Sequence, residues 1–258
     1  MKQLVERPFG LQGPCEMIEQ ICEQAHKYEY SGIRPGHFCL GPDPGIRREA
    51  FVQYTAYSFK KNRVLKFQCG LDDYLMISFD GSLQNLKKNF GIIESAAIYS
   101  NHYENVIGMD ISAISEHLGE TLESEFLKRL KEVCKHACVV FFVSGERTIY
   151  EQKLLNKISE CIDDVKNLTV EPYTKTDICD LVTKRLTECG IEIRNQKTFC
   201  KVLHEVITNL SITTDKDAMK VANSLVDYAV FSDSSPYIDD CCLKSLIKQR
   251  RNDIRGVK

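Results

Sequence analysis

The sequence predicts an α/β fold in which a parallel sheet flanked by helices is followed by a small all-helical domain. Short apolar segments alternate with amphipathic helical segments as far as about residue 172, which is typical of a parallel sheet covered by helices. After that point the strand pattern stops and helical spacing continues alone. Between residues 38 and 52, a turn with two Gly and two Pro joins an apolar strand to a helical segment. This strand–loop–helix layout is that of a phosphate-binding loop.

Strands and helices alternate in the first part of the chain. The strand pattern occurs at residues 38–40, 63–68, 75–79, 105–110, 137–143 and 168–170. The segment 75–79 also fits the start of a loop. The segment 137–143 is apolar throughout, which predicts a strand buried on both faces and therefore central in the sheet. Helical spacing predicts helices over residues 14–26, 49–59, 82–97, 120–135 and 150–162.

The second part of the chain carries only helical patterns. We expect helices over residues 176–189, 195–210 and 215–231, then a turn rich in Ser and Asp, and a last helix over 239–254. The predicted organisation has three parts: an α/β domain at 1–172, a helical lid domain at 173–235 and a basic C-terminal helix or tail at 236–258.

Charge and hydropathy narrow the class of protein. The 258 residues carry a net charge of −2, so no overall basic field predicts a nucleic-acid partner. No apolar run approaches the ~18–20 residues that cross a bilayer. The first residues lack the apolar segment of a secretory signal. We therefore expect a cytoplasmic protein without membrane contact.

The twelve cysteines are scattered, and no C-x-x-C spacing occurs. The densest group is Cys134, His136 and Cys138, which offers three zinc ligands, whereas a structural zinc site normally has four. We interpret these cysteines as buried or half-buried thiols in a reducing compartment, and we predict no metal site among them.

The loop after the first strand holds the candidate phosphate-binding residues. Arginine side chains near a helix N-terminus suit a phosphate, because the helix dipole and bidentate hydrogen bonds both favour an anion. The alternative is a solvated charge pair. At the end of the strand 105–110, Asp110 fits either a Mg²⁺ ligand or a hydrogen-bonded structural acid. The candidate residues of the loop are Gly41, Asp43, Gly45, Arg47, Arg48 and Glu49.

The order of these segments resembles the AAA+ ATPase module, a P-loop NTPase domain followed by a helical lid. Within that superfamily the layout is most similar to the red-type rubisco activases and the stage V sporulation protein K, over residues 10–231. The resemblance implies ATP or ADP with Mg²⁺ as cofactors, and a protein partner or self-association.

The loop departs from the family's Gly-Asn-Pro-Gly-Thr-Gly-Lys-Thr. Residues 43–45 match Asn-Pro-Gly, but residues 46–49 then stand against Thr-Gly-Lys-Thr. A second alignment, anchored on Gly41, puts Arg47 at the Lys and Arg48 at the Ser or Thr. Both alignments lack the Lys and the hydroxyl that holds Mg²⁺.

Other functional positions of the family are also altered. Asp110 matches the metal-orienting Asp of the Walker B strand, but Ile111 stands where the family has its water-activating Glu. Ser144 is the one candidate near the place of sensor 1. An acid, Glu160, stands where the resemblance places an arginine finger, and Met219 stands at the Arg of sensor 2.

These losses predict a degenerate ATPase, more an interaction module or scaffold than an enzyme. The alternative is an unorthodox ATPase that binds nucleotide through Arg47 or Arg48 and acts only beside a partner subunit. A loop collapsed by a salt bridge from either arginine to Asp110 or Glu49 favours the scaffold. Residues 244–258 carry six basic residues and one acid, but we interpret them as a solvated face and not as a nucleic-acid contact. No Cys and His spacing favours a hydrolase.

Overall fold

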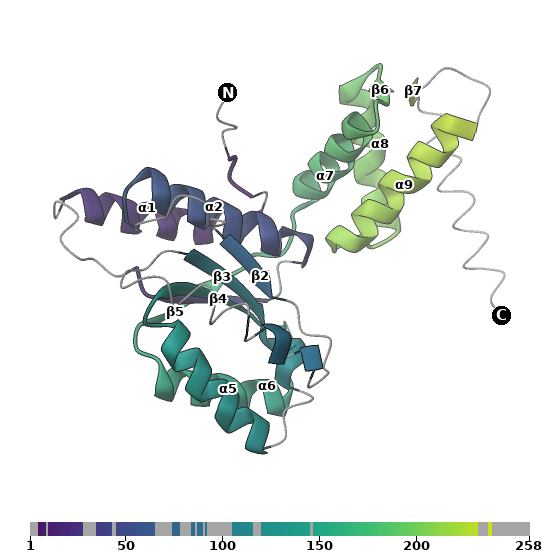
Figure 1. Cartoon of the computed structure of the whole chain (residues 1–258). Helices are drawn as coiled ribbons and strands as arrows, with labels where there is room; N and C mark the ends of the chain where they lie inside the picture. The colour runs from purple at the N-terminus through teal and green to yellow at the C-terminus, as the bar shows by residue number, and fades with distance from the viewer. Residues whose placement is uncertain are drawn as a thin grey trace. The chain divides into compact units, whose positions relative to one another are not determined.

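A computed structural model describes residues 5–8, 10–27, 35–42, 45–64, 74–77, 84–85, 87–89, 91, 105–115, 120–144, 147–231 and 237–238. The chain divides into two compact units, Met1–Glu171 and Pro172–Lys258 (Figure 1). Within the described ranges, no helix is both long and apolar enough to cross a membrane.

The first unit is built on a five-stranded parallel sheet in the order β2-β3-β4-β1-β5. The prediction of a parallel sheet flanked by helices is therefore confirmed, with β4 in the middle and every described side chain of that strand buried. The register puts Asp110 and Leu40 beside Phe142, so these residues are level at the carboxyl edge of the sheet. The strands are β1 (His37–Gly41), β2 (Tyr74–Ile77), β3 (Asn105–Asp110), β4 (Ala137–Phe142) and β5 (Val165–Thr169).

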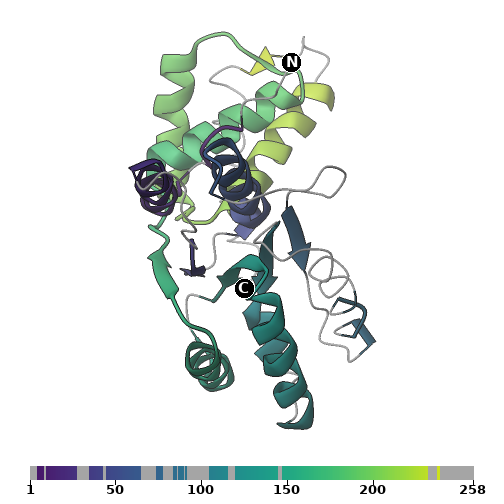
Figure 2. The ribbon, with the colours of Figure 1, turned by 60° about the vertical axis from the view of Figure 1, so that its left-hand side comes forward.

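Helices cover both faces of this sheet (Figures 1 and 2). One face packs α1 (Gln12–Lys27) and α2 (Arg48–Lys61) against alternate strand residues such as Phe38 and Phe142. The opposite face packs α5 (Glu120–Val133) and α6 (Ile149–Cys161) against the intervening ones, among them Phe141. Successive strand residues point to opposite faces, so one apolar strand serves two cores. Two short helices, η1 (Gly45–Arg47) and α4 (Ile111–Ser115), follow β1 and β3 at the carboxyl edge.

The second unit packs three helices around its own apolar core. Thr174 and Asp177 form a capping box that starts α7, and the side chain of Asn195 caps α8. A two-stranded parallel pair adjoins the helices in this unit. Its elements are α7 (Lys175–Glu188), β6 (Glu192–Ile193), α8 (Gln196–Asn209), α9 (Asp215–Phe231) and β7 (Tyr237–Ile238).

Some predicted elements differ from the structure. The strand expected from residue 63 does not begin there: Arg63 lies in a turn with φ of 55°, and the N–H of Val64 bonds to the carbonyl of Phe59. Residues 65–68 and most of the helix predicted at 82–97 lie outside the described residues, as does the whole helix predicted at 239–254. Tyr237–Ile238, assigned by sequence to the basic tail, forms strand β7.

Candidate functional site

The candidate site lies at the carboxyl edge of the sheet, where β1 ends and α2 begins. A Cβ added to Gly41 would lie 2.4 Å from Cγ2 of Val143, so the close approach of this loop to the end of β4 requires glycine. Gly45 has φ of 60° and starts η1. Residues 43–44 lie outside the described residues, and with them the predicted site residue Asp43.

Arg48 forms an ion pair with Asp110 across this edge. Its Nη1 lies 2.5 Å from Oδ2 of Asp110, and the two side chains are 25% and 17% exposed. The guanidinium Cζ also lies 5.7 Å from the ring centroid of Phe142. An arginine over an aromatic face and against a carboxylate combines a cation–π contact with a charge-assisted hydrogen bond. The structure thus has one of the salt bridges that the sequence analysis associated with a collapsed loop.

Arg47 is turned away from this pair and into the protein. Its side chain is only 6% exposed, and its Nη1 donates a hydrogen bond of 3.0 Å to the carbonyl of Gly10. Glu49, the third charged residue in succession, is exposed and accepts a hydrogen bond of 3.2 Å from the Tyr74 hydroxyl. Each of the three therefore contacts a different segment of the first unit.

The start of α2 is not capped by the side chain of its N-cap residue. That residue, Arg47, has helical dihedral angles, φ −84° and ψ −5°, and makes no side-chain hydrogen bond to the first turn. Glu49 in that turn supplies a negative charge that favours the helix dipole.

Ser144, the candidate for sensor 1, is bound by a residue that the sequence analysis missed. Its backbone N–H donates to Oε1 of Glu151 at 2.6 Å, and its Oγ donates to Oε2 of the same carboxylate. Glu151 is only 1% exposed, and its own N–H donates to Oγ1 of the helix N-cap Thr148. A Thr followed three residues later by Glu is a capping-box spacing, so a signal for this residue was present in the sequence.

The remaining altered positions lie on described elements. Ile111, which the sequence resemblance aligns with a water-activating Glu, starts α4 and is fully buried. Glu160 is exposed near the end of α6, and Met219 is half-buried in α9 of the second unit.

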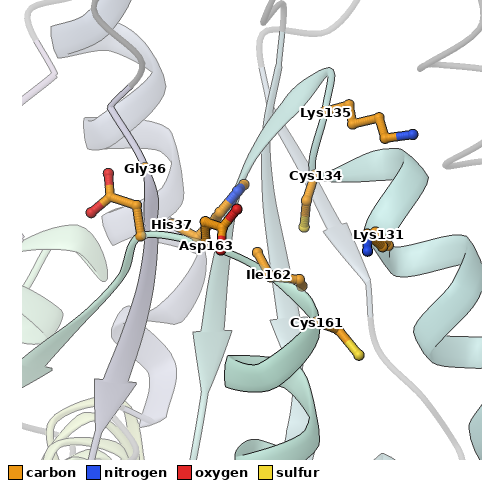
Figure 3. Close-up of a pocket in the computed structure, with 9 residues that line it drawn as sticks. Gly36, His37, Lys131, Cys134, Lys135, Cys161, Ile162 and Asp163 are labelled. Atoms are coloured by element: carbon orange, nitrogen blue, oxygen red, sulfur yellow. The ribbon is translucent and has the colours of Figure 1, made fainter.

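A cavity of about 320 Å³ lies at the opposite, amino edge of the sheet (Figure 3). The buried imidazole in its wall, that of His37, accepts a hydrogen bond from the N–H of Val139 at Nδ1, and burial lowers the pKa of His37 to about 4. Burial raises the pKa of the Cys134 thiol, which disfavours the thiolate. The lining residues are Gly36, His37, Lys131, Cys134, Lys135, Cys161, Ile162, Asp163 and Asp164.

The two lysines and two aspartates that line this cavity balance one another in formal charge. In the part of the chain that the structure describes, no three His, Cys, Asp or Glu residues are arranged to hold a metal ion. Cys134 and Cys138 are both buried and belong to no such group.

Comparison with known proteins identifies the fold. No protein-family model matches the chain, and no curated protein matches its sequence. Among solved structures, the RuvB Holliday junction branch migration motor of Thermotoga maritima matches with a TM-score of 0.58 at 10% identity, over 95% of this chain and 73% of RuvB. A point variant of the same RuvB gives 0.60 with the same identity and coverage. Domain III of the replication initiation protein DnaA from T. maritima gives 0.57 at 14% identity, over 95% of this chain and 94% of that domain. The chain therefore has the fold of the AAA+ P-loop ATPases.

Proposed function

We propose that this chain is an AAA+-like interaction module that acts through contacts with a protein partner or with copies of itself and does not hydrolyse ATP. One observation carries the proposal: at the end of β3, Asp110 is engaged by Arg48, and the next residue, Ile111, is buried. Hydrolysis by a P-loop ATPase needs a metal ion at the Asp that ends this strand, here Asp110. It also needs a group that orients water near the next residue, here Ile111.

The residues at this place do not fit Mg²⁺, the metal that the fold family implies. In P-loop ATPases the ion is held by the loop Ser or Thr together with the Walker B Asp. Here the group against Asp110 is a guanidinium, which has only hydrogen-bond donors and no lone pair for a metal. Its positive charge also repels a cation.

The residue that stands where a P-loop ATPase has its catalytic base supports the same conclusion. A positioned general base typically contributes about 10²–10⁴-fold to the rate. Ile111 has an alkyl side chain with no proton-accepting atom, and it is packed in the core of the first unit. Ser144 is held by the buried Glu151, and so it has a structural role beside α6.

The alternative, an ATPase that binds nucleotide through its loop arginines, needs both to exchange their present partners. Arg47 would have to leave a buried position and its bond to the Gly10 carbonyl. Arg48 would have to leave Asp110. Nucleotide would therefore bind through these arginines only at the cost of rearranging two contacts.

We also propose that residues 173–235 act as a lid domain and that residues 236–258 form a basic tail. We further propose that the chain is most similar to the red-type rubisco activases and stage V sporulation protein K, and that it is cytoplasmic. The cysteines of the described part are thiols and are mostly buried, which fits a reducing compartment. The acidic net charge gives no support to a nucleic-acid partner.

The test is turnover and nucleotide binding by the purified full chain. We expect no phosphate release from ATP with Mg²⁺ above the blank. We also expect no heat in calorimetric titrations with ATP or ADP, with or without Mg²⁺. Binding tighter than ~100 μM, about −5.5 kcal/mol, or measurable turnover would refute the proposal. Self-association, read by sedimentation, should be the same with and without nucleotide.

A further inference from the structure

We propose that Arg48 is a built-in replacement for the divalent metal of a phosphate loop: its guanidinium holds the start of α2 to the end of β3, so that the site is ordered without metal or nucleotide. The inference rests on the proposed function and deepens it, since it states what keeps the inactive site together.

The geometry places one cation between three elements. Arg48 is the first residue of α2, and its Nη1 reaches Oδ2 of Asp110, the last residue of β3, at 2.5 Å. The same guanidinium lies over the ring of Phe142, the last residue of β4, with 5.7 Å from Cζ to the centroid. Asp110 and Phe142 are direct partners in the β3–β4 register. A single side chain therefore links α2 to both strands.

The alignment anchored on Gly41 relates this contact to the metal site of a phosphate loop. In that alignment Arg48 stands at the Ser or Thr whose hydroxyl shares Mg²⁺ with the Walker B Asp. The structure brings the same two positions into contact, but through a covalently attached cation. The carboxylate of Asp110 is only 17% exposed, and an enclosed charge is costly unless it is paired or hydrogen-bonded. A metal supplies a positive partner only when it is bound, whereas Arg48 supplies it permanently.

The two kinds of cation differ in what else they can do. A bound metal keeps coordination positions for phosphate oxygens and water while it contacts the carboxylate. A guanidinium has a planar fork of donors and no coordination positions. Arg48 can therefore reproduce the structural role of the metal but not its role in catalysis. Divalent ions should therefore neither bind at this site nor change the stability of the protein, and replacing Arg48 should change both results.

The test uses the full chain and Mn²⁺ alone as the probe, read by electron paramagnetic resonance, together with thermal unfolding in chelator and in Mn²⁺. Wild type should bind no Mn²⁺ at this site and unfold at the same temperature in both conditions. Arg48→Thr places a hydroxyl beside an intact Asp110. It should unfold about 2–4 °C lower in chelator and recover in Mn²⁺. It should also bind Mn²⁺, which wild type should not.

Two further variants are the controls. The double variant Arg48→Thr/Asp110→Asn keeps the hydroxyl but lacks the carboxylate, so it should show no response to Mn²⁺. Arg48→Lys keeps a positive charge at the position and should retain most of the stability of wild type without responding to Mn²⁺. If Lys were as destabilising as Thr, the charge would not be the feature that matters, and the inference would be wrong.

The inference is also overturned if Arg48→Thr, folded by circular dichroism, neither loses stability in chelator nor gains Mn²⁺ binding. Its failure is distinguishable from failure of the proposed function. Wild type that hydrolyses ATP with Mg²⁺ refutes the proposed function whatever the variants do. An inactive wild type with an unresponsive Arg48→Thr variant leaves the proposed function standing and refutes only the role of Arg48.

Discussion

Glu151, buried in the first turn of α6, accepts hydrogen bonds from both the backbone N–H and the hydroxyl of Ser144 at the end of β4. The carboxylate thereby ties Ser144 to the first turn of α6. Thr148 caps the same helix by accepting from the N–H of Glu151. A single acid thus fixes the chain at Ser144.

We expect Glu151→Ala to lower the free energy of unfolding by about 2 kcal/mol, because it deprives the half-buried N–H of Ser144 of a charged acceptor. Ser144→Ala is the matched control, since it removes only the hydroxyl bond and keeps the N–H bond. It should cost about 1 kcal/mol. Urea denaturation of the three proteins measures both values. A Glu151→Ala variant as stable as wild type would show that the turn does not depend on this carboxylate.

The ion pair at the candidate site should be energetically coupled. A double-mutant cycle with Arg48→Gln and Asp110→Asn should give a coupling free energy of about 1–2 kcal/mol, because each single change leaves a partly enclosed charge without its partner. The exposed pair Arg129 and Glu125 on α5 is the reference, and its cycle should give a clearly smaller coupling. Equal coupling free energies for the two pairs would show that the pair of Arg48 and Asp110 is no stronger than an exposed surface ion pair.

Stability should fall in acid because of His37. Burial lowers the pKa of His37 from 6.5 to about 4, so the folded protein keeps the imidazole neutral while the unfolded chain takes up a proton below its ordinary pKa. The stability that neutral His37 contributes to the folded protein is fully present above about pH 6.5. It is lost progressively as the pH falls toward 4, to a total of about 3 kcal/mol for this group.

Urea denaturation at a series of pH values between these limits measures the slope. His37→Gln keeps a hydrogen-bond acceptor for the N–H of Val139 but cannot titrate. Its stability should therefore change less with pH than that of wild type over the same interval. Parallel pH profiles for the two proteins would show that His37 does not cause the acid sensitivity.

The sheet could be predicted from the sequence where its strands were long and apolar. Strand β4 has six residues, all buried, and its uniform apolar pattern was enough to identify it as central. Strands β6 and β7 have two residues each, which is too short for any periodicity to be recognised. At Arg63, where the alternation predicted the start of a strand, the chain instead adopts a positive φ and turns.

The site was predictable only in part, for a similar physical reason. Opposite charges at neighbouring strand and helix ends made the pairing of Arg48 with Asp110 one of the possibilities. Nη1 of Arg47 donates to a backbone carbonyl, that of Gly10, and such an acceptor exists at every residue and leaves no signal in the sequence. The role of Glu151 had a signal in its capping-box spacing, but its bond to Ser144 depends on how β4 meets α6.

The close approach between the loop and β4 gives the last prediction. Gly41→Ala adds a Cβ that would lie 2.4 Å from Cγ2 of Val143, so one of the two segments must shift. We expect a loss of about 1–3 kcal/mol in the free energy of unfolding. Val143→Ala removes the methyl group that clashes, so the double variant Gly41→Ala/Val143→Ala should be more stable than the sum of the two single losses predicts. Gly13→Ala is the control: a Cβ there meets nothing within 4 Å, and the change should be neutral or slightly stabilising. Additive losses at residues 41 and 143 would mean that the loop does not pack on Val143 as the structure has it.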